Sequence, residues 1–319
     1  MKPIKPHHLA SVIVLAAALS SVALSQTSFL NRQPPPVSDS ARQEMEARLR
    51  QAEADHEANP NDAGTIIWVG RRLGYLGRFR QAIDKFSKGI AKFPADARFY
   101  RHRGHRHITV RQFELAIADL EKAARLTRGK PDEIEPDGQP NARNIPTSTL
   151  QFNIWYHLGL AYYLTNQNEK ALKAYRECLK VSRSPDRLVA TSHWLYMTLR
   201  RMKRDSEAAK VPEPIKEGMD VIENAGYYRL LLMYKGVIPT EVLLAETLKQ
   251  ENSAASHSVM YGIGNWYLYN GRRDEAVGLY RKMLDSEQWT SFGYIAAEAD
   301  LKRVSAVNGE DKVADNELR

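Results

Sequence analysis

Cysteine is nearly absent from this sequence, since Cys178 is the only one in the chain. A single thiol excludes an intrachain disulfide framework and any cysteine-based zinc cluster. Three catalytic signatures are also missing: a Gly-rich phosphate loop with GK[ST], a G-x-S-x-G nucleophile elbow and an H-E-x-x-H zinc motif. From these absences we expect no cofactor, no metal ion and no catalytic residues.

The overall composition is that of a folded protein with an excess of positive charge. Hydrophobic residues make up 43% and charged residues 26% of the chain, which is typical of globular proteins and not of disordered ones. Lys and Arg number 46 against 38 Asp and Glu, so the formal net charge is +8. A basic chain favours acidic partners or an anionic surface.

The N-terminal segment has the pattern of a secretory signal. Lys2 and Lys5 precede an apolar run from Leu9 to Leu24, and small residues stand at its end. This order predicts cleavage after Ser25 and export to the periplasm or cell envelope of a bacterium. An uncleaved N-terminal anchor is the alternative, although the run is shorter than the about 20 residues that span a bilayer.

Small residues recur at a fixed period of 34 in the chain. Gly70 and Gly104 form one such pair, and Ala82 and Ala116 form another. A glycine in one helix and an alanine in the next allow the two helices to approach closely. A period of this length predicts stacked helix pairs, because one pair alone cannot bury its apolar face.

One stretch carries the fullest form of this pattern, Trp155-x2-Leu158-Gly159-x2-Tyr162 followed by Ala171-x3-Tyr175. Together with the period, it resembles the tetratricopeptide repeat (TPR) family. The resemblance implies an all-α fold, a right-handed α-solenoid of helix-turn-helix repeats with capping helices at both ends. It also implies a scaffold that binds proteins or peptides, and not an enzyme.

The steps between the recurring alanines divide the chain. The step from Ala116 to Ala171 is longer than one period, which predicts an insertion, and the step from Ala208 to Ala276 equals two periods, which predicts a degenerate unit between them. The predicted segments are a signal peptide 1–25, a linker and capping helix 26–62, two repeat units 63–128, a Pro-rich acidic insertion 129–151, two units 152–222, a degenerate helical unit 223–256, a last unit 257–290, and a capping helix with a disordered tail 291–319.

The insertion is rich in proline and in acidic residues. Prolines between Pro131 and Pro146 exclude a continuous helix, and Glu133, Glu135 and Asp137 make the segment locally negative. A long connection without regular structure is uncommon in a compact array and is often functional. We interpret it either as a solvated loop or as an arm that contacts a partner.

The family resemblance implies that the first helix of each unit lines a concave groove, which here would be basic and aromatic. Arginine binds carboxylates and rigid rings supply contact area, so we predict a protein or peptide partner that is acidic or carries a free carboxylate. The alternative is that the charges solvate the inner face and the rings pack between repeats. The predicted groove residues are Arg71, Tyr75, Arg98, Arg101, His102, His105, Tyr156, His157, Tyr163 and Trp194.

The run from Arg101 to His107 alternates arginine and histidine. His102 and His105 share a helix face, but no Asp, Glu or Cys in the local sequence completes a metal shell. Nucleic-acid binding needs clustered basic residues with stacking rings, and export argues against it. We therefore predict neither a metal site nor a nucleic-acid partner.

The layout of the second half is similar to envelope TPR adaptors of the NlpI type, through Ser192-His193-Trp194-Leu195-Tyr196 and Asn265-Trp266-Tyr267-Leu268-Tyr269. Such adaptors are dimeric scaffolds, but they carry a lipid-anchor cysteine that this chain lacks. We predict a non-enzymatic adaptor, with a homodimer and peripheral membrane contact left open. Two alternatives are an envelope hydrolase with an unrecognised active site and a protein that binds anionic lipid surfaces.

Overall fold

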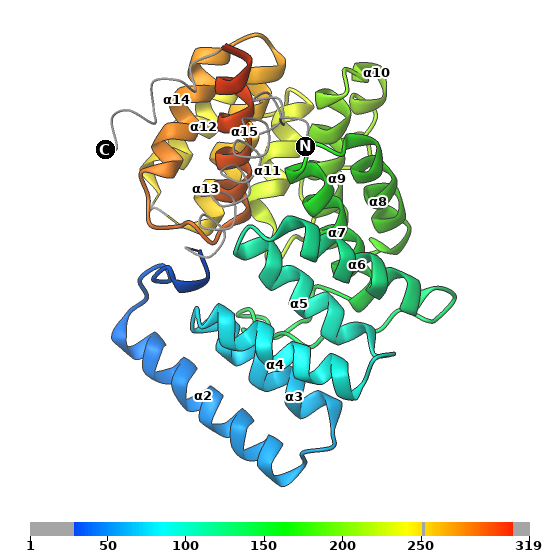
Figure 1. Ribbon diagram of the computed structural model, residues 1–319. Helices are drawn as coiled ribbons and strands as arrows, with labels where there is room; N and C mark the ends of the chain where they lie inside the picture. The colour runs from blue at the N-terminus through cyan, green and yellow to red at the C-terminus, as the bar shows by residue number, and fades with distance from the viewer. Residues whose placement is uncertain (1–28, 251–252, 309–319) are drawn as a thin grey trace, which may run out of the picture.

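The computed structural model describes residues 29–250 and 253–308. The predicted all-α solenoid is confirmed, and an antiparallel bridge between Ile134 and Thr149 is the only strand-like pairing in the described part of the chain (Figure 1). The helices are α2 (Asp39–Ala58), α3 (Ala63–Tyr75), α4 (Phe79–Lys92), α5 (Ala97–Thr109), α6 (Phe113–Thr127), α7 (Leu150–Leu164), α8 (Asn168–Val181), α9 (Pro185–Arg201), α10 (Asp205–Ala208), α11 (Ala225–Tyr234), α12 (Thr240–Lys249), α13 (Ala254–Tyr269), α14 (Arg273–Leu284) and α15 (Phe292–Asn308).

A residue with positive φ marks the turn inside several of the helix pairs. These residues are Gly77, Arg111, Asn166, Lys203 and Gly271. Each of them precedes one of the recurring alanines by the same short interval, so the turns repeat with the spacing of the alanines. A left-handed conformation costs a residue other than glycine about 1–3 kcal/mol. The recurring turn is therefore held by the packing of the helices it joins, even where the local residue disfavours it.

Small residues at the crossing points bring the two helices of a pair together. A Cβ atom added to Gly70 would lie 2.4 Å from Phe86 Cε1, and one added to Gly159 would lie 2.6 Å from Tyr175 Cε1. The alanines on the second helices are fully buried, namely Ala82, Ala116, Ala171, Ala208 and Ala276. The close approach inferred from the sequence is thus present in the packing.

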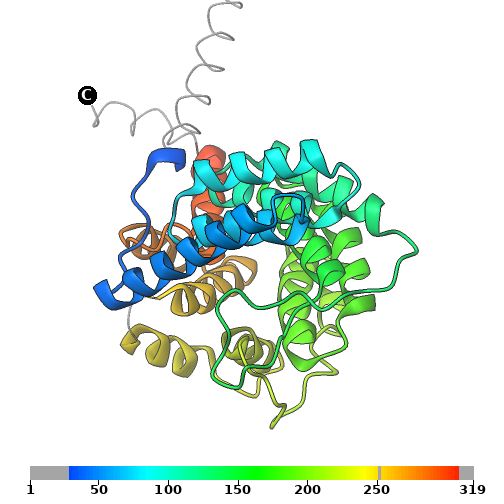
Figure 2. The same cartoon turned by 90° about the horizontal axis from the view of Figure 1, so that it is seen from below.

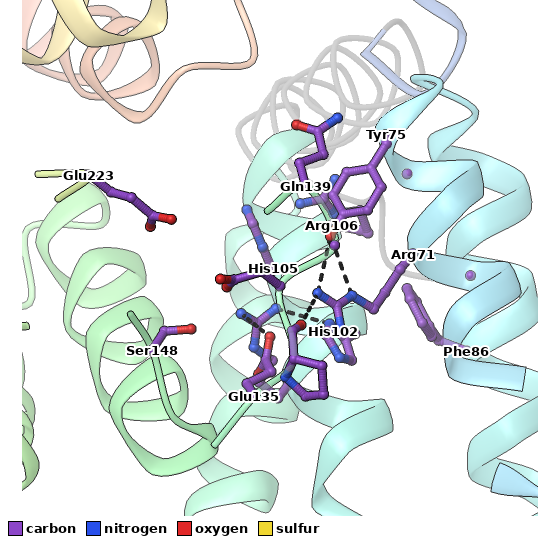
Figure 3. A pocket seen from close by; sticks show the side chains of 16 residues that line it. Arg71, Tyr75, Phe86, His102, His105, Arg106, Glu135, Gln139, Ser148 and Glu223 are labelled. Carbon is purple, nitrogen blue, oxygen red and sulfur yellow. Dashed lines mark hydrogen bonds and ion pairs between the residues drawn. The ribbon is translucent and has the colours of Figure 1, made fainter. Parts of the chain in front are cut away.

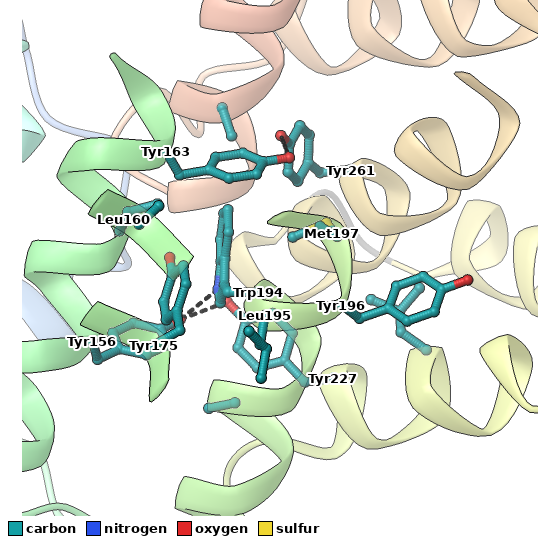
Figure 4. Close-up of a cluster of buried hydrophobic side chains, with 14 of the residues drawn as sticks. Tyr156, Leu160, Tyr163, Tyr175, Trp194, Leu195, Tyr196, Met197, Tyr227 and Tyr261 are labelled. Carbon is teal, nitrogen blue, oxygen red and sulfur yellow. Dashed lines mark hydrogen bonds between the residues drawn. The ribbon is translucent and has the colours of Figure 1, made fainter. Parts of the chain in front are cut away.

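The largest core cluster joins α7, α8, α9, α11 and α13, and large aromatic rings fill its centre (Figure 4). Trp194 is 1% exposed, and its indole Nε1 donates a hydrogen bond to Tyr156 Oη at 2.8 Å. Tyr261 Oη donates to Tyr163 Oη at 2.9 Å, which ties α13 to α7. These hydroxyl groups therefore find partners inside a core that is otherwise apolar.

The C-terminal helix α15 returns to the first half of the molecule. It packs on α13 and α14 and also reaches α7. Arg111, just after α5, pairs with Glu298 of α15 at 2.9 Å. Trp289, in the loop before α15, packs against Phe79 of α4 and against Phe29 near the N-terminal end of the described chain. The two ends of the array therefore meet, as the blue and red segments of Figure 1 show.

The insertion between α6 and α7 leaves the helical layers as a long loop and returns across them (Figure 2). Its two arms pair briefly, since Leu150 N donates to Glu133 O at 2.8 Å and Glu135 N donates to Ser148 O at 3.2 Å. This pairing fixes the direction in which the acidic part of the insertion points.

The predicted signal peptide at 1–25 lies outside the described residues, and so does the part of the predicted tail, 306–319, that lies beyond the end of α15 at Asn308. Between residues 29 and 308, none of the described helices combines the length and the apolarity that crossing a bilayer requires.

Candidate functional site

A pocket of about 250 Å³ lies between α3, α5 and the insertion (Figure 3). Half of the predicted groove residues line it, namely Arg71, Tyr75, Arg101, His102 and His105. Gly70 and Gly74 of α3 and Phe86 of α4 complete the wall behind them. The structure therefore brings together the predicted groove residues of the first two repeat units, with the exception of Arg98.

Helical spacing places these side chains on one side of each helix. Arg71 and Tyr75 are one turn apart on α3, and the Arg71 guanidinium donates to Tyr75 Oη from Nε at 3.3 Å and from Nη2 at 3.2 Å. On α5, Arg101 and His105 are also one turn apart and line the same pocket. The two helices thus present arginine and aromatic side chains to a common space.

Arg106 also lines the pocket, although it was not among the predicted groove residues. Its guanidinium lies beside Gly74, with Nη1 3.1 Å from the position of an added Cβ, and it stands 5.8 Å from the ring centre of Phe79. The Arg106 side chain forms no hydrogen bond or ion pair with any residue that the structure describes. Burial lowers the pKa of Arg106 to about 10, so the group still carries its charge at neutral pH.

Arg101 and Glu135 form a buried ion pair across the pocket. Arg101 Nη2 lies 2.8 Å from Glu135 Oε1, and the two residues are 8% and 9% exposed. Arg101 Nε and Glu135 Oε2 have no partner within the described structure. The pair therefore uses fewer hydrogen bonds than a guanidinium and a carboxylate can form together.

Three imidazoles near the arginines are neutral at physiological pH. Burial, followed by repulsion from neighbouring arginines, holds the pKa values of His102, His105 and His157 well below their usual range. Arg101 Nη1 donates to His102 Nδ1 at 2.9 Å, which requires a lone pair on that nitrogen. The positive charge of the pocket therefore comes from its arginines.

The insertion forms the roof of the pocket. Arg71 Nη2 donates to the carbonyl oxygen of Pro136 at 2.7 Å, and Arg72 Nη1 donates to that of Gly138 at 2.6 Å. Gly138 lies against Tyr75, so that an added Cβ would stand 1.8 Å from Tyr75 Oη. Neither sequence-based interpretation of the insertion foresaw that it covers the groove of its own chain.

Cations and carboxylates in the pocket come from different parts of the molecule. The helical walls contribute Arg71, Arg101 and Arg106 and no carboxylate. The lining carboxylates are Glu135 and Asp137 of the insertion and Glu223 from the segment before α11. Burial raises the pKa of Asp137, and repulsion by Glu223 and Glu135 adds to this effect. The insertion thus supplies much of the negative charge that balances the groove.

Helix α15 closes the groove on its other side. The ring of Phe292 lies 5.3 Å from that of His105, 5.5 Å from that of His157 and 6.4 Å from that of Tyr156. The sequence placed a capping helix at the end of the array, but it did not indicate that this helix would reach the second and third units.

Four predicted groove residues belong to the core. Tyr163 is 0%, Trp194 1%, His157 3% and Tyr156 6% exposed. The prediction that they line an open groove is wrong, because α11, α13 and α15 pack over the positions that would face a partner in an uncovered array. Their rings instead serve the packing between repeats, which was the alternative interpretation.

Arg98 lies apart from the pocket. Its side chain is 44% exposed, and its guanidinium donates to both carboxylate oxygens of Asp96, from Nε at 3.0 and 3.1 Å and from Nη2 at 2.6 Å. Asp96 also caps the N-terminus of α5 by accepting from the backbone N–H of Arg98 at 3.0 Å. Arg98 is therefore engaged at the helix terminus and does not line this pocket, although with Arg71 and His102 it lines a neighbouring pocket of about 220 Å³.

A larger cleft of about 710 Å³ lies between α6, α7 and α8, and it was not predicted from the sequence. Cations such as Arg125 and Lys170 alternate there with Glu121 and Glu177 around Trp155, so both signs of charge are present. Within the described residues, no three His, Cys, Asp or Glu side chains are placed so that they could hold a metal ion.

Sequence reasoning missed Arg106, which lines the pocket, and Arg72, which bonds to the insertion through Gly138 O, although a weak signal for both was present. Both extend a basic pattern already noted, since Arg72 follows Arg71 and Arg106 is one turn beyond His102. The contacts of Glu135 and Gly138 could not be predicted from the neighbouring sequence, because their partners lie on α5 and α3, which are distant along the chain.

Comparison with known proteins identifies the repeat. Two family models of the tetratricopeptide repeat match residues 152–185 and residues 259–292. The resemblance seen in the sequence is thereby confirmed, and the chain contains tetratricopeptide repeats.

Among curated proteins, the chain is similar to small glutamine-rich tetratricopeptide repeat-containing protein 2 of Saccharomyces cerevisiae. The two are 24% identical over 166 residues, which cover 52% of this chain and 38% of that protein. The match therefore spans well under half of the relative's length.

Solved structures with a similar fold include YrrB, described as a TPR protein with an unusual peptide-binding site, and MamA. Both have 16% sequence identity and a TM-score of 0.42; the YrrB match covers 79% of this chain and 97% of YrrB, and the MamA match 61% and 91%. The Cut9–Hcn1 complex gives a TM-score of 0.45 at 15% identity, covering 82% of this chain and 40% of the other.

Proposed function

We propose that this chain is a non-enzymatic adaptor, because it carries tetratricopeptide repeats, a fold that serves as a scaffold for protein interactions. Its partner presents an acidic segment, or a free carboxylate, to the pocket between α3 and α5. The protein acts in the periplasm or cell envelope of a bacterium, after export by its N-terminal segment.

The observation that carries this proposal is the unpaired guanidinium of Arg106. It lines a partly enclosed pocket together with Arg71 and Arg101, and the helical walls offer it no carboxylate. A half-buried cation that has no carboxylate partner keeps part of its desolvation cost, so an anion that reaches it gains more than at a fully hydrated surface. The side chain of an acidic residue has the charge and the planar geometry to fill this position.

The export setting rests on the order of charge, apolar run and small residues at the N-terminus. Cleavage after Ser25 would leave only a short stretch before Phe29, whose ring packs on Trp289 at 5.8 Å between centroids.

A binding titration tests the proposal. The probe is a fluorescein-labelled peptide of alternating Glu and Ser, with a peptide of alternating Gln and Ser for comparison. We expect the acidic peptide to bind, and Arg106→Glu to weaken its binding by about tenfold or more, or about 1.4 kcal/mol. Arg183→Glu is the matched control, because Arg183 is exposed and lies outside the pocket.

Three outcomes would contradict the proposed function. They are failure of the acidic peptide to bind, equal binding of both peptides, and equal weakening by the two arginine substitutions. Binding should also decline with added salt, since the attraction is between charges.

A further inference from the structure

We propose that the insertion is an internal ligand of the basic pocket, and that an acidic partner segment binds by taking its place. This inference rests on the proposed function and adds to it the form of the partner and the competitor that it must displace.

The contacts of the insertion are those that any extended acidic peptide could make. Two backbone carbonyl oxygens, of Pro136 and Gly138, accept hydrogen bonds from Arg71 and Arg72, and the Glu135 carboxylate pairs with Arg101. Every peptide has backbone carbonyls, so the only side chain that these contacts require in a partner is an acidic one. We therefore expect the partner segment to have the same form as the insertion, namely an extended chain with an acidic side chain next to two carbonyl groups that accept hydrogen bonds.

The insertion has little apolar attachment to the helices. In the loop that precedes α7, the two large aliphatic side chains point outward, since Ile134 is 69% and Ile145 42% exposed, and the buried Leu150 belongs to the first turn of α7. Its outer part is held by polar contacts, among them the exposed ion pair of Arg143 with Asp220 at 2.6 Å and a hydrogen bond from the buried Thr147 hydroxyl to Glu223 at 2.6 Å. Polar surface contacts contribute little net stability and weaken with salt. The segment can thus leave the groove without uncovering a hydrophobic core.

The insertion also leaves the pocket incompletely satisfied. Arg106 has no carboxylate, and both Arg101 Nε and Glu135 Oε2 lack partners in the described structure. Asp137 lines the pocket but forms no ion pair with any described residue. A partner with two carboxylates could pair with both Arg101 and Arg106, whereas the insertion pairs only with Arg101.

Displacement of Glu135 would also return positive charge to the groove. With the insertion in place, Glu135 and Asp137 offset the arginines of the helical walls. Once these two carboxylates move away, only Glu223 of the lining residues remains negative. The attraction for an acidic segment therefore grows as the insertion leaves, which favours exchange of one acidic segment for another.

Glu135→Gln is the decisive variant, with Glu133→Gln as its control. Both residues lie in the insertion, but Glu133 is exposed and forms no ion pair with a described residue. A weaker internal competitor raises the fraction of molecules with an open pocket, so the alternating Glu and Ser peptide should bind Glu135→Gln roughly tenfold more tightly than the wild-type chain. Glu133→Gln should bind the peptide with unchanged affinity.

A second measurement uses the unaltered chain and does not depend on the folding of a variant. Hydrogen exchange should become faster at the amide groups of Glu135 and Leu150 when the acidic peptide is added. These amides bond to Ser148 O and Glu133 O at the base of the insertion. The comparison peptide with Gln should leave their exchange unchanged.

The outcomes separate the two proposals. If the acidic peptide binds and needs Arg106, but Glu135→Gln gains no affinity and exchange in the insertion is unaltered, the internal-ligand inference is wrong and the adaptor proposal stands. If no variant binds the acidic peptide, both proposals fail.

Discussion

At the scale of single residues, the same glycine substitution should have opposite effects at two helical positions. Gly159→Ala should lower the free energy of unfolding by about 1–3 kcal/mol, because the added Cβ would stand 2.6 Å from the fully buried ring of Tyr175. Gly278→Ala should raise it by up to about 1 kcal/mol, since nothing lies within 4 Å of the added atom and alanine favours the helix.

Urea unfolding of the two alanine variants beside the wild-type chain measures this contrast. Equal effects at Gly159 and Gly278 would mean that helix propensity, and not the contact between paired helices, governs these positions. The helix-pair contact would then not explain why small residues recur there.

His193 should make the folded state sensitive to acid. Burial lowers its pKa from 6.5 to about 3, and its Nε2 has no partner in the described structure. The unfolded chain binds the proton more readily, so the contribution of His193 to stability is complete above about pH 6.5 and is lost as the pH falls toward about 3.

Within that range, His193 should remove about 1.4 kcal/mol of stability per pH unit. His193→Gln should therefore be less stable at neutral pH, but its stability should fall less steeply on acidification. Urea midpoints at several pH values between about 7 and about 5 measure the slope. Equal slopes for the variant and the wild-type chain would show that His193 is not buried as a neutral ring.

At the scale of the elements, sequence spacing predicts the contacts that lie within one repeat unit and recur from unit to unit. Gly70, Ala82 and their equivalents fix the register of the helix pairs because each contact lies within one unit. Trp194 occupies a position that faces the groove in a regular array, but it is buried here because α11 and α13 pack over α9. No spacing rule indicates this, since the intervening unit lacks the small residues of the pattern.

The covering of the groove by the insertion lay beyond sequence reasoning for a similar reason. The acidic character of the insertion and the basic character of the groove were both evident from composition. Their pairing through Glu135 and Arg101 joins residues of different elements that are far apart along the chain. Two complementary charges can also remain apart in solvent, so composition alone does not establish that they meet.

The attachment of α15 to the end of α5 should depend on one buried ion pair. Arg111 and Glu298 side chains are 7% and 16% exposed, and removal of one partner leaves the other charge buried. Glu298→Ala should therefore lower the free energy of unfolding by about 3 kcal/mol. Glu217→Ala, at an exposed position without an ion pair among the described residues, should change it by no more than about 0.5 kcal/mol.

Thermal or urea unfolding measures both glutamate variants. A change of less than about 1 kcal/mol for Glu298→Ala would indicate that the pair gains no more than its desolvation costs. The packing of Phe292 and its neighbours would then hold α15 in place without help from the ion pair.

At the scale of the whole molecule, contact between the two ends distinguishes this array from an open solenoid. In an open array each repeat touches only its neighbours, and stability adds up along the chain. Here the indole Nε1 of Trp289 donates to Gln33 O at 2.7 Å, and Arg303 Nη1 donates to Leu164 O at 3.0 Å. The Trp289 bond therefore joins the two ends of the described chain, and the Arg303 bond ties the last helix to α7. Loss of the contact between the ends should change the shape of the molecule.

Trp289→Ala tests this closure. The indole is 1% exposed and packs against Phe29 and Phe79, so its loss should cost about 3–5 kcal/mol and separate the two ends. Small-angle X-ray scattering should then give a larger radius of gyration, while circular dichroism reports the same helical content. Trp266→Ala removes a half-buried indole from α13 and should leave the radius unchanged. An unchanged radius in Trp289→Ala would mean that the curvature of the stacked repeats, and not the contact between the ends, sets the closed shape.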